Sequence, residues 1–426
     1  MRVLFILALL SSAVSPALAQ GGRVEINVTD PAAGLRVQAT IAFLDTRPQS
    51  AALFVRPLGD ATYQRVEGVD QGGGIWLVDL PFVYPAQGVE GYAQYVLDGQ
   101  TFTEPVDNPE TAPVRVPAFI AAITSDISLP SRLNRMVTIP VVLGELANSP
   151  QELGSDNPID VLGQTFGSSG DPSLWRAFRW NAPEQRYRDA VTDPGSVRIR
   201  PGRGFWLVTA QGGTFKVTEG LSAGVAFEDG DPQAVPVVVR LQSGWNQIGN
   251  PYLFPIQWSD VERPAGVEDP VAHEPGPDNG RYVGGQSTLR TWEGYFVFNT
   301  GPPTDIQFRV RPGGSQARTG DRPIAERIRE RAGRDASVLG ITARSGDLED
   351  AVYLGRDGVV TDAPIDLRKP AALGRSFRLS VVSDGQDWIG RFQDGVWTLG
   401  LEADTDATLD LQAFGDWPGF VVEDVD

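Results

Sequence analysis

The sequence predicts an all-β protein built from tandem β-sandwich domains, and three features lead to this fold class. The 426 residues include 48 glycines and 33 prolines, which leaves little uninterrupted length for helices. Short runs between these residues alternate apolar and polar positions, as half-buried strands do, and Val24–Val28 is one example. An aromatic signature also occurs twice, as Gly202–Val208 (GRGFWLV) and Trp292–Phe298 (WEGYFVF). Such recurrence predicts a duplicated β unit whose rings fill a core.

Residues 1–19 are predicted to be a secretory signal peptide. A positive charge precedes the apolar run Val3–Leu10, and a small-x-small cleavage site ends at Ala19, so the mature chain is expected to begin at Gln20. The apolar run is too short to span a bilayer, and no later segment replaces it. We therefore expect no transmembrane segment after signal removal, and a location in the periplasm, on the cell surface or outside the cell.

Composition excludes several classes of chemistry. The chain has no cysteine, which removes disulfides, zinc–thiolate sites and thiol nucleophiles. Its single histidine cannot form a histidine-based zinc site, which needs several such ligands. A formal charge of -18 disfavours nucleic acids and anionic membrane surfaces as partners.

Shifts in composition divide the rest of the chain into four segments. An immunoglobulin-like β-sandwich, a duplicated aromatic-rich β module, a helical linker and a C-terminal β-sandwich are predicted at 20–117, 118–314, 315–334 and 335–426. The linker is helix-like because Asp321 can cap it, Pro323 suits its first turn and Gly333 ends it. A capping box predicts a further one-turn helix at Ser149–Gly154.

Alternation predicts individual strands in the two outer segments. In the first segment they are 51–55, 75–80 and 92–97, with turn residues between them at the spacing typical of a sandwich. In the last segment, apolar residues share one face along Trp397–Leu401 and again along Leu409–Ala413. A short polar turn separates these two runs, which predicts a hairpin with one dry side.

Several of these stretches resemble non-catalytic modules of large secreted proteins from Gram-negative bacteria that use type IX secretion. In that family an immunoglobulin-like module carries a strand beginning Gly-Val-Glu and rich in tyrosine, and Gly88–Gly99 is similar to it. The next module of the family is matched at Trp175–Trp180, Pro201–Val208, Gly244–Pro251 and Trp292–Asn299. The C-terminal segment is similar to the module that commonly follows. Family members usually finish with a sorting domain, which is not visible before Asp426, and the resemblance implies no catalytic residues.

Gly220–Gly224 (GLSAG) matches the Gly-x-Ser-x-Gly turn of hydrolases, in which Ser222 would be the nucleophile and His273 its base. That turn requires a helix after the serine, whereas the sequence here leads into a strand and a turn. His273 is expected in an exposed, proline-rich loop. The sequence therefore favours a structural role for both residues.

Clusters of carboxylates leave calcium binding open, although no cofactor is predicted. They occur at Glu228–Asp231, Asp347–Asp350 and Glu402–Asp410. Oxygen-rich loops can bind calcium, but none of these has the spacing of a known calcium loop. Asp-Gly and Asp-Pro steps are also ordinary turn chemistry.

The ten tryptophans suggest a second kind of ligand site. Those within alternating strands are expected in the core, and they are Trp206, Trp245, Trp292 and Trp397. Flat rings outside such strands could stack on sugar faces. The candidate ligand platform consists of Trp175, Trp180, Trp258 and Trp417.

The sequence therefore predicts an exported, non-catalytic structural or interaction protein, whose loops contact a protein or glycan partner outside the cytoplasm. A carbohydrate-binding accessory protein that uses exposed tryptophans is the alternative. A secreted hydrolase, built on Ser222 or on a pair of carboxylates, is a third and less favoured reading.

Overall fold

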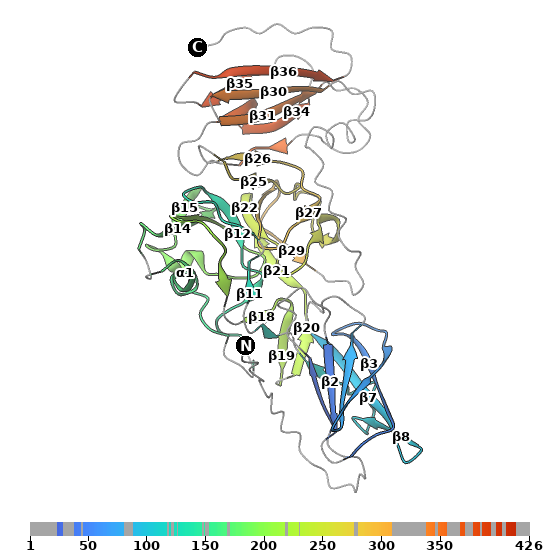
Figure 1. The fold of residues 1–426 in the computed structure, drawn as a ribbon. Helices are drawn as coiled ribbons and strands as arrows, with labels where there is room; N and C mark the ends of the chain where they lie inside the picture. Colours follow the sequence, from blue (N-terminus) through green and yellow to red (C-terminus); the bar gives the residue numbers. More distant parts are fainter. Residues whose placement is uncertain are drawn as a thin grey trace.

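The computed structural model is predominantly β, and the residues it describes contain a single α-helix, α1 (Pro158–Phe166). Figure 1 shows the strands in three groups in series: β1–β9, then β10–β29 with α1, then β30–β36. The all-β class is confirmed at this level. The structure describes residues 24–28, 38–43, 46–80, 88–116, 119–120, 123–125, 127–146, 149, 153–167, 171–217, 220–229, 231–276, 280–308, 338–345, 348–355, 367–370, 378–383, 386–392, 398–402 and 406–414.

Several sequence-based predictions fall on other residues. The signal peptide at 1–19, the helical linker at 315–334, Trp397 and Trp417 lie outside the described residues, and so do residues 150–152 of the one-turn helix expected at Ser149–Gly154.

The first group of strands forms two sheets with a shared core. One sheet has the order β1-β2-β6-β5, and the other has the order β4-β3-β7-β8 with β9 beside β7. Buried side chains from both sheets meet between them, including Ile41, Val78, Leu53 and Tyr95. The three strands expected in this segment correspond to β3, β6 and β7. The strands are β1 Val24–Val28, β2 Gln38–Phe43, β3 Ser50–Pro57, β4 Gln64–Glu67, β5 Val69–Gly72, β6 Ile75–Asp79, β7 Val89–Leu97, β8 Gln100–Glu104 and β9 Val114–Val116.

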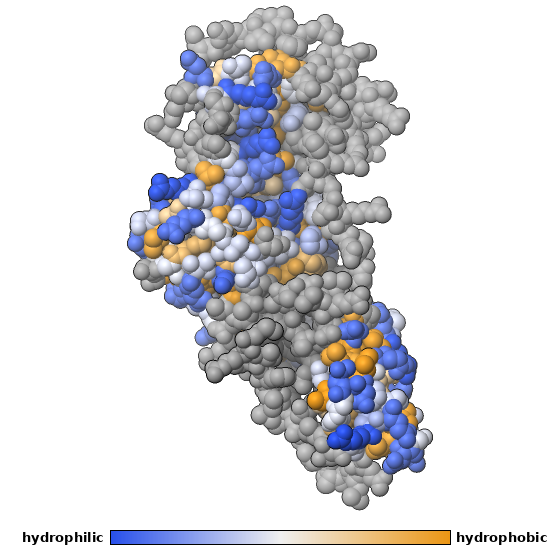
Figure 2. All heavy atoms as spheres, viewed as in Figure 1, coloured by the Kyte–Doolittle hydropathy of each residue, from blue (hydrophilic) through white to orange (hydrophobic). Residues whose placement is uncertain are grey.

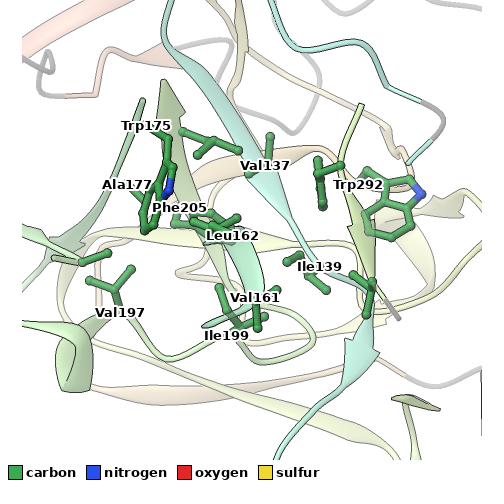
Figure 3. Packing of buried hydrophobic residues seen from close by; sticks show 14 of the residues in the cluster. Val137, Ile139, Val161, Leu162, Trp175, Ala177, Val197, Ile199, Phe205 and Trp292 are labelled. Atoms are coloured by element: carbon green, nitrogen blue, oxygen red, sulfur yellow. The ribbon is translucent and has the colours of Figure 1, made fainter. Parts of the chain in front are cut away.

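The middle group consists of many short strands around separate apolar cores. The first core contains Trp175 and Phe205, and part of it is drawn in Figure 3. The second core contains Tyr252 and Tyr295. The first strands of this group are β10 Phe119–Ile120, β11 Ile123–Thr124, β12 Arg135–Thr138, β13 Val141–Val142, β14 Trp175–Asn181, β15 Arg186–Asp189, β16 Gly204–Thr209, β17 Lys216–Val217, β18 Gly220–Ser222, β19 Val225–Glu228 and β20 Asp231–Ala234. The others are β21 Val237–Leu241, β22 Gly244–Gly249, β23 Ile256–Gln257, β24 Val261–Glu262, β25 Ala272–Glu274, β26 Arg281–Val283, β27 Thr288–Leu289, β28 Gly294–Asn299 and β29 Thr304–Phe308. Two short 3₁₀ turns in the described part of this group are η1 Pro194–Val197 and η2 Trp258–Asp260.

The two aromatic signatures form strands β16 and β28, and their rings are buried as predicted. β16 pairs antiparallel with β12, and β28 pairs antiparallel with β22. Successive rings face opposite ways: Phe205 enters the first core and Tyr295 the second, whereas Trp206 and Phe296 share a third cluster. Each of these four rings is at most 3% exposed.

Three glycines let these two strand pairs touch, and with Thr138 we call them the glycine junction. A Cβ on Gly249 would lie 2.3 Å from the Cβ of Thr138. A Cβ on Gly204 would lie 2.4 Å from the carbonyl oxygen of Ile248, and one on Gly294 would lie 2.7 Å from the Cγ of Met136. Carbon atoms in favourable contact lie about 3.5–4.0 Å apart, so a larger residue would push the strand pairs apart.

Two backbone hydrogen bonds join the strand pairs reciprocally. The amide of Thr138 donates to the carbonyl of Trp292 at 2.9 Å, and the amide of Gly249 donates to the carbonyl of Gly202 at 3.0 Å. The chain turns in the same way before each aromatic strand, because φ is +78° at Gly202 and +64° at Trp292. Positive φ is unfavourable for a bulky residue. The Trp292 ring is nevertheless held by burial and by edge-on packing against Phe215 at 5.1 Å between centroids.

The last group of strands forms one mixed sheet, and the hairpin predicted within it is wrong. The order is β35-β33-β34-β31-β30-β36, with β32 beside β34, and β31 runs parallel to β34. The two expected hairpin strands, β35 and β36, pair with β33 and β30 at opposite edges of the sheet. Alternation indicates which side chains share a face, but not which strand lies alongside. The strands are β30 Val338–Ser345, β31 Leu348–Gly355, β32 Leu367–Arg368, β33 Arg378–Ser383, β34 Gln386–Phe392, β35 Thr398–Glu402 and β36 Thr408–Phe414.

The helix α1 was not predicted from the sequence. The Asn157 side chain accepts a hydrogen bond from the amide of Ile159 at 3.1 Å and so caps the helix start. Pro158 occupies the first turn, where its missing amide hydrogen costs nothing. The helix buries Val161 and Leu162 in the first core.

Substituting Gly249 by alanine tests the glycine junction. We expect Gly249→Ala to lower the free energy of unfolding by about 1–3 kcal/mol, because the new methyl group collides with Thr138. Chemical denaturation followed by tryptophan fluorescence measures this change. The matched control is Gly195→Ala, whose Cβ meets only a side-chain oxygen of Asp193 at 3.8 Å and should change stability by less than about 0.5 kcal/mol. Equal effects of the two substitutions would contradict the close approach.

Candidate functional site

The candidate functional site is the aromatic cluster where the middle group of strands meets the C-terminal sheet. Trp206, Trp245, Tyr282 and Phe296 contribute rings from β16, β22, β26 and β28, and Ile389 of β34 packs against them from the C-terminal sheet. Ring centroids lie 5.8 Å apart for Trp245 and Phe296 and 6.1 Å apart for Tyr282 and Phe296, both edge-on. We call Trp206, Trp245, Tyr282, Phe296, Ile389 and the side chains packed against them the interbody cluster, because it lies between the middle group of strands and the C-terminal sheet.

The interbody cluster also contains polar side chains. His273 packs edge-on against Trp206 at 4.5 Å and against Tyr282 at 5.3 Å between centroids. Burial raises the pKa of Tyr282 and of Tyr187, so both phenols stay protonated. The cluster therefore joins two parts of the chain through apolar area, with hydroxyl and imidazole groups inside it.

Arg368 ties the two parts together beside this cluster. Its guanidinium lies over the ring of Phe298 at 4.4 Å and over the ring of Trp388 at 4.3 Å. It also donates from Nε to Glu268 of the middle group at 3.0 Å. A planar cation held between two aromatic faces and a carboxylate fixes orientation in a way that a lysine could not.

A buried ionic group lies in the C-terminal sheet directly after Arg368. The ammonium of Lys369 donates to the Asp350 carboxylate, and the same carboxylate accepts from the amide of Leu379 at 2.7 Å. Arg378 donates to Asp387 at 2.7 Å. Burial lowers the pKa of Lys369 despite the attraction of Asp350. Lys369 is 4% and Asp350 2% exposed, so each charge depends on the other.

The structure does not bring the candidate tryptophan platform together. Trp175 lies in the first core at 1% exposed, where Figure 3 shows it near Leu162 and Phe205, and Trp258 lies in the second core at 2% exposed. Neither ring has a face open to a sugar, so the prediction that Trp175 and Trp258 belong to a ligand platform is wrong. Trp180 is partly exposed and packs edge-on against Tyr187.

The serine and histidine of the hydrolase motif also serve structural roles. Ser222 ends strand β18 and is 3% exposed, so its hydroxyl is not presented in a turn between strand and helix. The loop expected around His273 is wrong, because His273 lies in strand β25 opposite Tyr282. Prolines flank this short strand and made it resemble a loop in the sequence.

Carboxylates from two of the three clusters form ion pairs with arginines. Glu349 binds Arg281 and Arg344, and Asp410 also binds Arg344. Among the described residues, no group of three or more histidine or carboxylate side chains is arranged to hold a metal ion. Asp347 and Asp404 fall outside the described residues.

Arg368 and Lys369 were missed by the sequence reasoning. One signal was present: the chain has only two lysines, Lys216 and Lys369, and the second directly follows an arginine and precedes a proline. The aromatic faces around Arg368 come from residues far apart in the sequence, and no local pattern indicates such a contact.

Comparisons with known proteins return no relative. No protein-family model matches the chain. No curated protein and no solved structure matches it either. Within the described part of the chain, no helix has the length and apolar character needed to cross a membrane.

Removing the charge of Asp350 tests the buried ionic group. We expect Asp350→Asn to lower the free energy of unfolding by about 3–5 kcal/mol, because it leaves the Lys369 ammonium buried without a carboxylate. Adding Lys369→Met to this variant should restore part of the loss, because no charge is then left buried without a partner. The recovery stays incomplete, because the single amide oxygen of the asparagine can accept from only one of the Leu379 and Ala351 amides that bond the two oxygens of Asp350. Urea denaturation of the three proteins measures both effects.

The matched control is Glu349→Gln, which alters a neighbouring but exposed carboxylate and should cost no more than about 1 kcal/mol. A double variant no more stable than Asp350→Asn alone would show that the buried charge is not the cause.

Proposed function

We propose that this chain is an exported, non-catalytic structural or interaction protein, in which tandem β-sandwich modules hold surface loops in a fixed arrangement for a partner. The observation that carries the proposal is the burial of the aromatic residues of both signatures. Phe205, Trp206, Tyr295 and Phe296 all fill apolar clusters, which is the role of rings that build a scaffold.

Contacts between the groups of strands support a rigid scaffold. Arg368 and Ile389 connect the C-terminal sheet to the middle group, as described above. At the other end, a Cβ on Gly59 of the first group would lie 2.8 Å from the Cβ of Ala234 in β20. Modules in direct contact at both ends keep their loops at set distances from one another.

The surface of the first group offers apolar contact area. The hairpin of β5 and β6 carries Val69 at 63% and Ile75 at 45% exposed, and Val106 in a loop is 62% exposed. Figure 2 shows hydrophobic residues interspersed with hydrophilic ones on this group. Small apolar areas within a charged surface suit a protein partner.

The proposal includes an immunoglobulin-like first module and a duplication within the middle one. The duplication is supported by two strand pairs of matching register, by positive φ at both Gly202 and Trp292, and by the reciprocal bonds to Gly249 and Thr138. Kinship with type IX secretion modules is part of the same proposal and rests on the motifs of the sequence.

The export half of this proposal predicts a processed chain. We expect the protein recovered from its native host to lie outside the cytoplasm and to begin at Gln20, because residues 1–19 have the pattern of a cleaved signal. Cell fractionation with intact-mass measurement checks both points. The control is a variant with Ala17 and Ala19 replaced by leucine, which should remain uncleaved. A cytoplasmic protein that retains residues 1–19 would contradict export.

A glycan array separates the interaction role from the carbohydrate-binding alternative. We expect the full chain to retain no glycan specifically, because two of the four candidate rings lie in the core. Trp180→Ala serves as the matched variant, since that ring is partly exposed. Glycan binding by the natural chain that Trp180→Ala abolishes would favour the alternative.

A further inference from the structure

Three arginines gather at one edge of the first core, and we call them the arginine cluster. Arg179 follows Ala177 on the core-facing side of β14, and Arg203 comes directly before β16, two residues before Phe205. The two strands are antiparallel neighbours, so these ends lie together; Figure 3 shows Ala177 near Phe205. Arg200 joins them through a turn in which the amide of Arg203 donates to the carbonyl of Arg200 at 3.2 Å.

The guanidinium groups of the arginine cluster have no carboxylate partner among the described residues, although the chain around them is rich in ion pairs. Acidic side chains in and next to these strands bind other arginines. Asp156 binds Arg198, and Asp189 binds Arg176. Glu184 binds Arg186 and Arg188. The cluster therefore concentrates uncompensated positive charge in a protein whose formal charge is -18.

The members of the arginine cluster repel one another. Burial, together with the charges of Arg203 and Arg200, lowers the pKa of Arg179 to about 9. Burial and Arg200 likewise lower the pKa of Arg203. Arg179 and Arg203 are half-buried and Arg200 is exposed, so an anion from solvent can reach the cluster. A bound anion would remove the repulsion.

We propose that the arginine cluster binds a tetrahedral oxyanion, sulfate or phosphate, either free or as an ester on a larger molecule. Each guanidinium presents a planar fork of donors that matches two oxygens of such a group. A tetrahedral oxyanion has enough oxygens to satisfy three forks at once, whereas a carboxylate has only two oxygens. The site is independent of the role proposed above.

Isothermal titration of the full chain with sodium sulfate and with sodium phosphate, at constant ionic strength, tests this assignment. We expect saturable binding that Arg179→Gln weakens by about tenfold or more, the effect of losing a charged hydrogen-bonding partner. We also expect Arg179→Gln without sulfate to melt at a higher temperature than the natural chain, because one repelling charge is gone. If that variant fails to fold, the exposed Arg200→Gln replaces it.

Further arms identify the source of the anion. The first arm compares a sulfated monosaccharide with its unsulfated parent and with free sulfate. Tighter binding of the sulfated sugar than of sulfate, with no binding of the parent, would assign the anion to an ester. Equal binding of the sulfated sugar and of sulfate would assign it to the free ion. The control is Arg47→Gln, which removes an exposed arginine from the first group of strands and should bind as the natural chain does. Equal binding by the natural chain and Arg179→Gln, a comparable loss in Arg47→Gln, or tighter binding of acetate than of sulfate would overturn the proposal.

Discussion

The close approach of two strand pairs at the glycine junction is the constraint on which the rest of the structure depends. β12 with β16 and β22 with β28 come within a distance that leaves no room for a Cβ at Gly204, Gly249 or Gly294. Because successive residues of a strand face opposite ways, this contact directs each aromatic ring into one of three clusters. The reciprocal amide bonds of Thr138 and Gly249 then hold each pair against the turn that leads into the other. The aromatic rings can therefore be buried only if the backbones of the two strand pairs lie this close together.

The same arrangement explains how the C-terminal sheet attaches. Trp206 and Phe296 point away from the first two cores. Their rings would be exposed to solvent if the C-terminal sheet did not pack against them. Ile389 supplies apolar area, and Arg368 adds a cation between Phe298 and Trp388. The buried pair of Lys369 and Asp350 follows directly in the chain and positions the strand that carries Arg368. The interbody cluster is thus built from inward-facing rings of one part and a covering sheet from the other.

Local pattern predicted local structure well and long-range partners poorly. Period-two alternation located β3, β6 and β7, and the paired glycine–aromatic motifs predicted buried strands, because both signals lie within a few residues. The expected hairpin failed because β35 and β36 are adjacent in sequence yet occupy opposite sheet edges. Trp175 and Trp258 were assigned to a surface because burial depends on distant cores. The start of α1 was readable in Asn157-Pro158, a cap followed by a first-turn proline. Arg368 and the arginine cluster depend on contacts between separate elements, which sequence spacing does not encode.

Hydrogen exchange at two amides tests the central claim most directly. The amides of Thr138 and Gly249 donate across the glycine junction, so they should exchange only when the whole middle group unfolds, and they should be among its slowest. Site-resolved exchange rates by nuclear magnetic resonance measure this. Rates at Thr138 and Gly249 as fast as those of surface turns would contradict an interlocked pair of aromatic strands and the scaffold built on it.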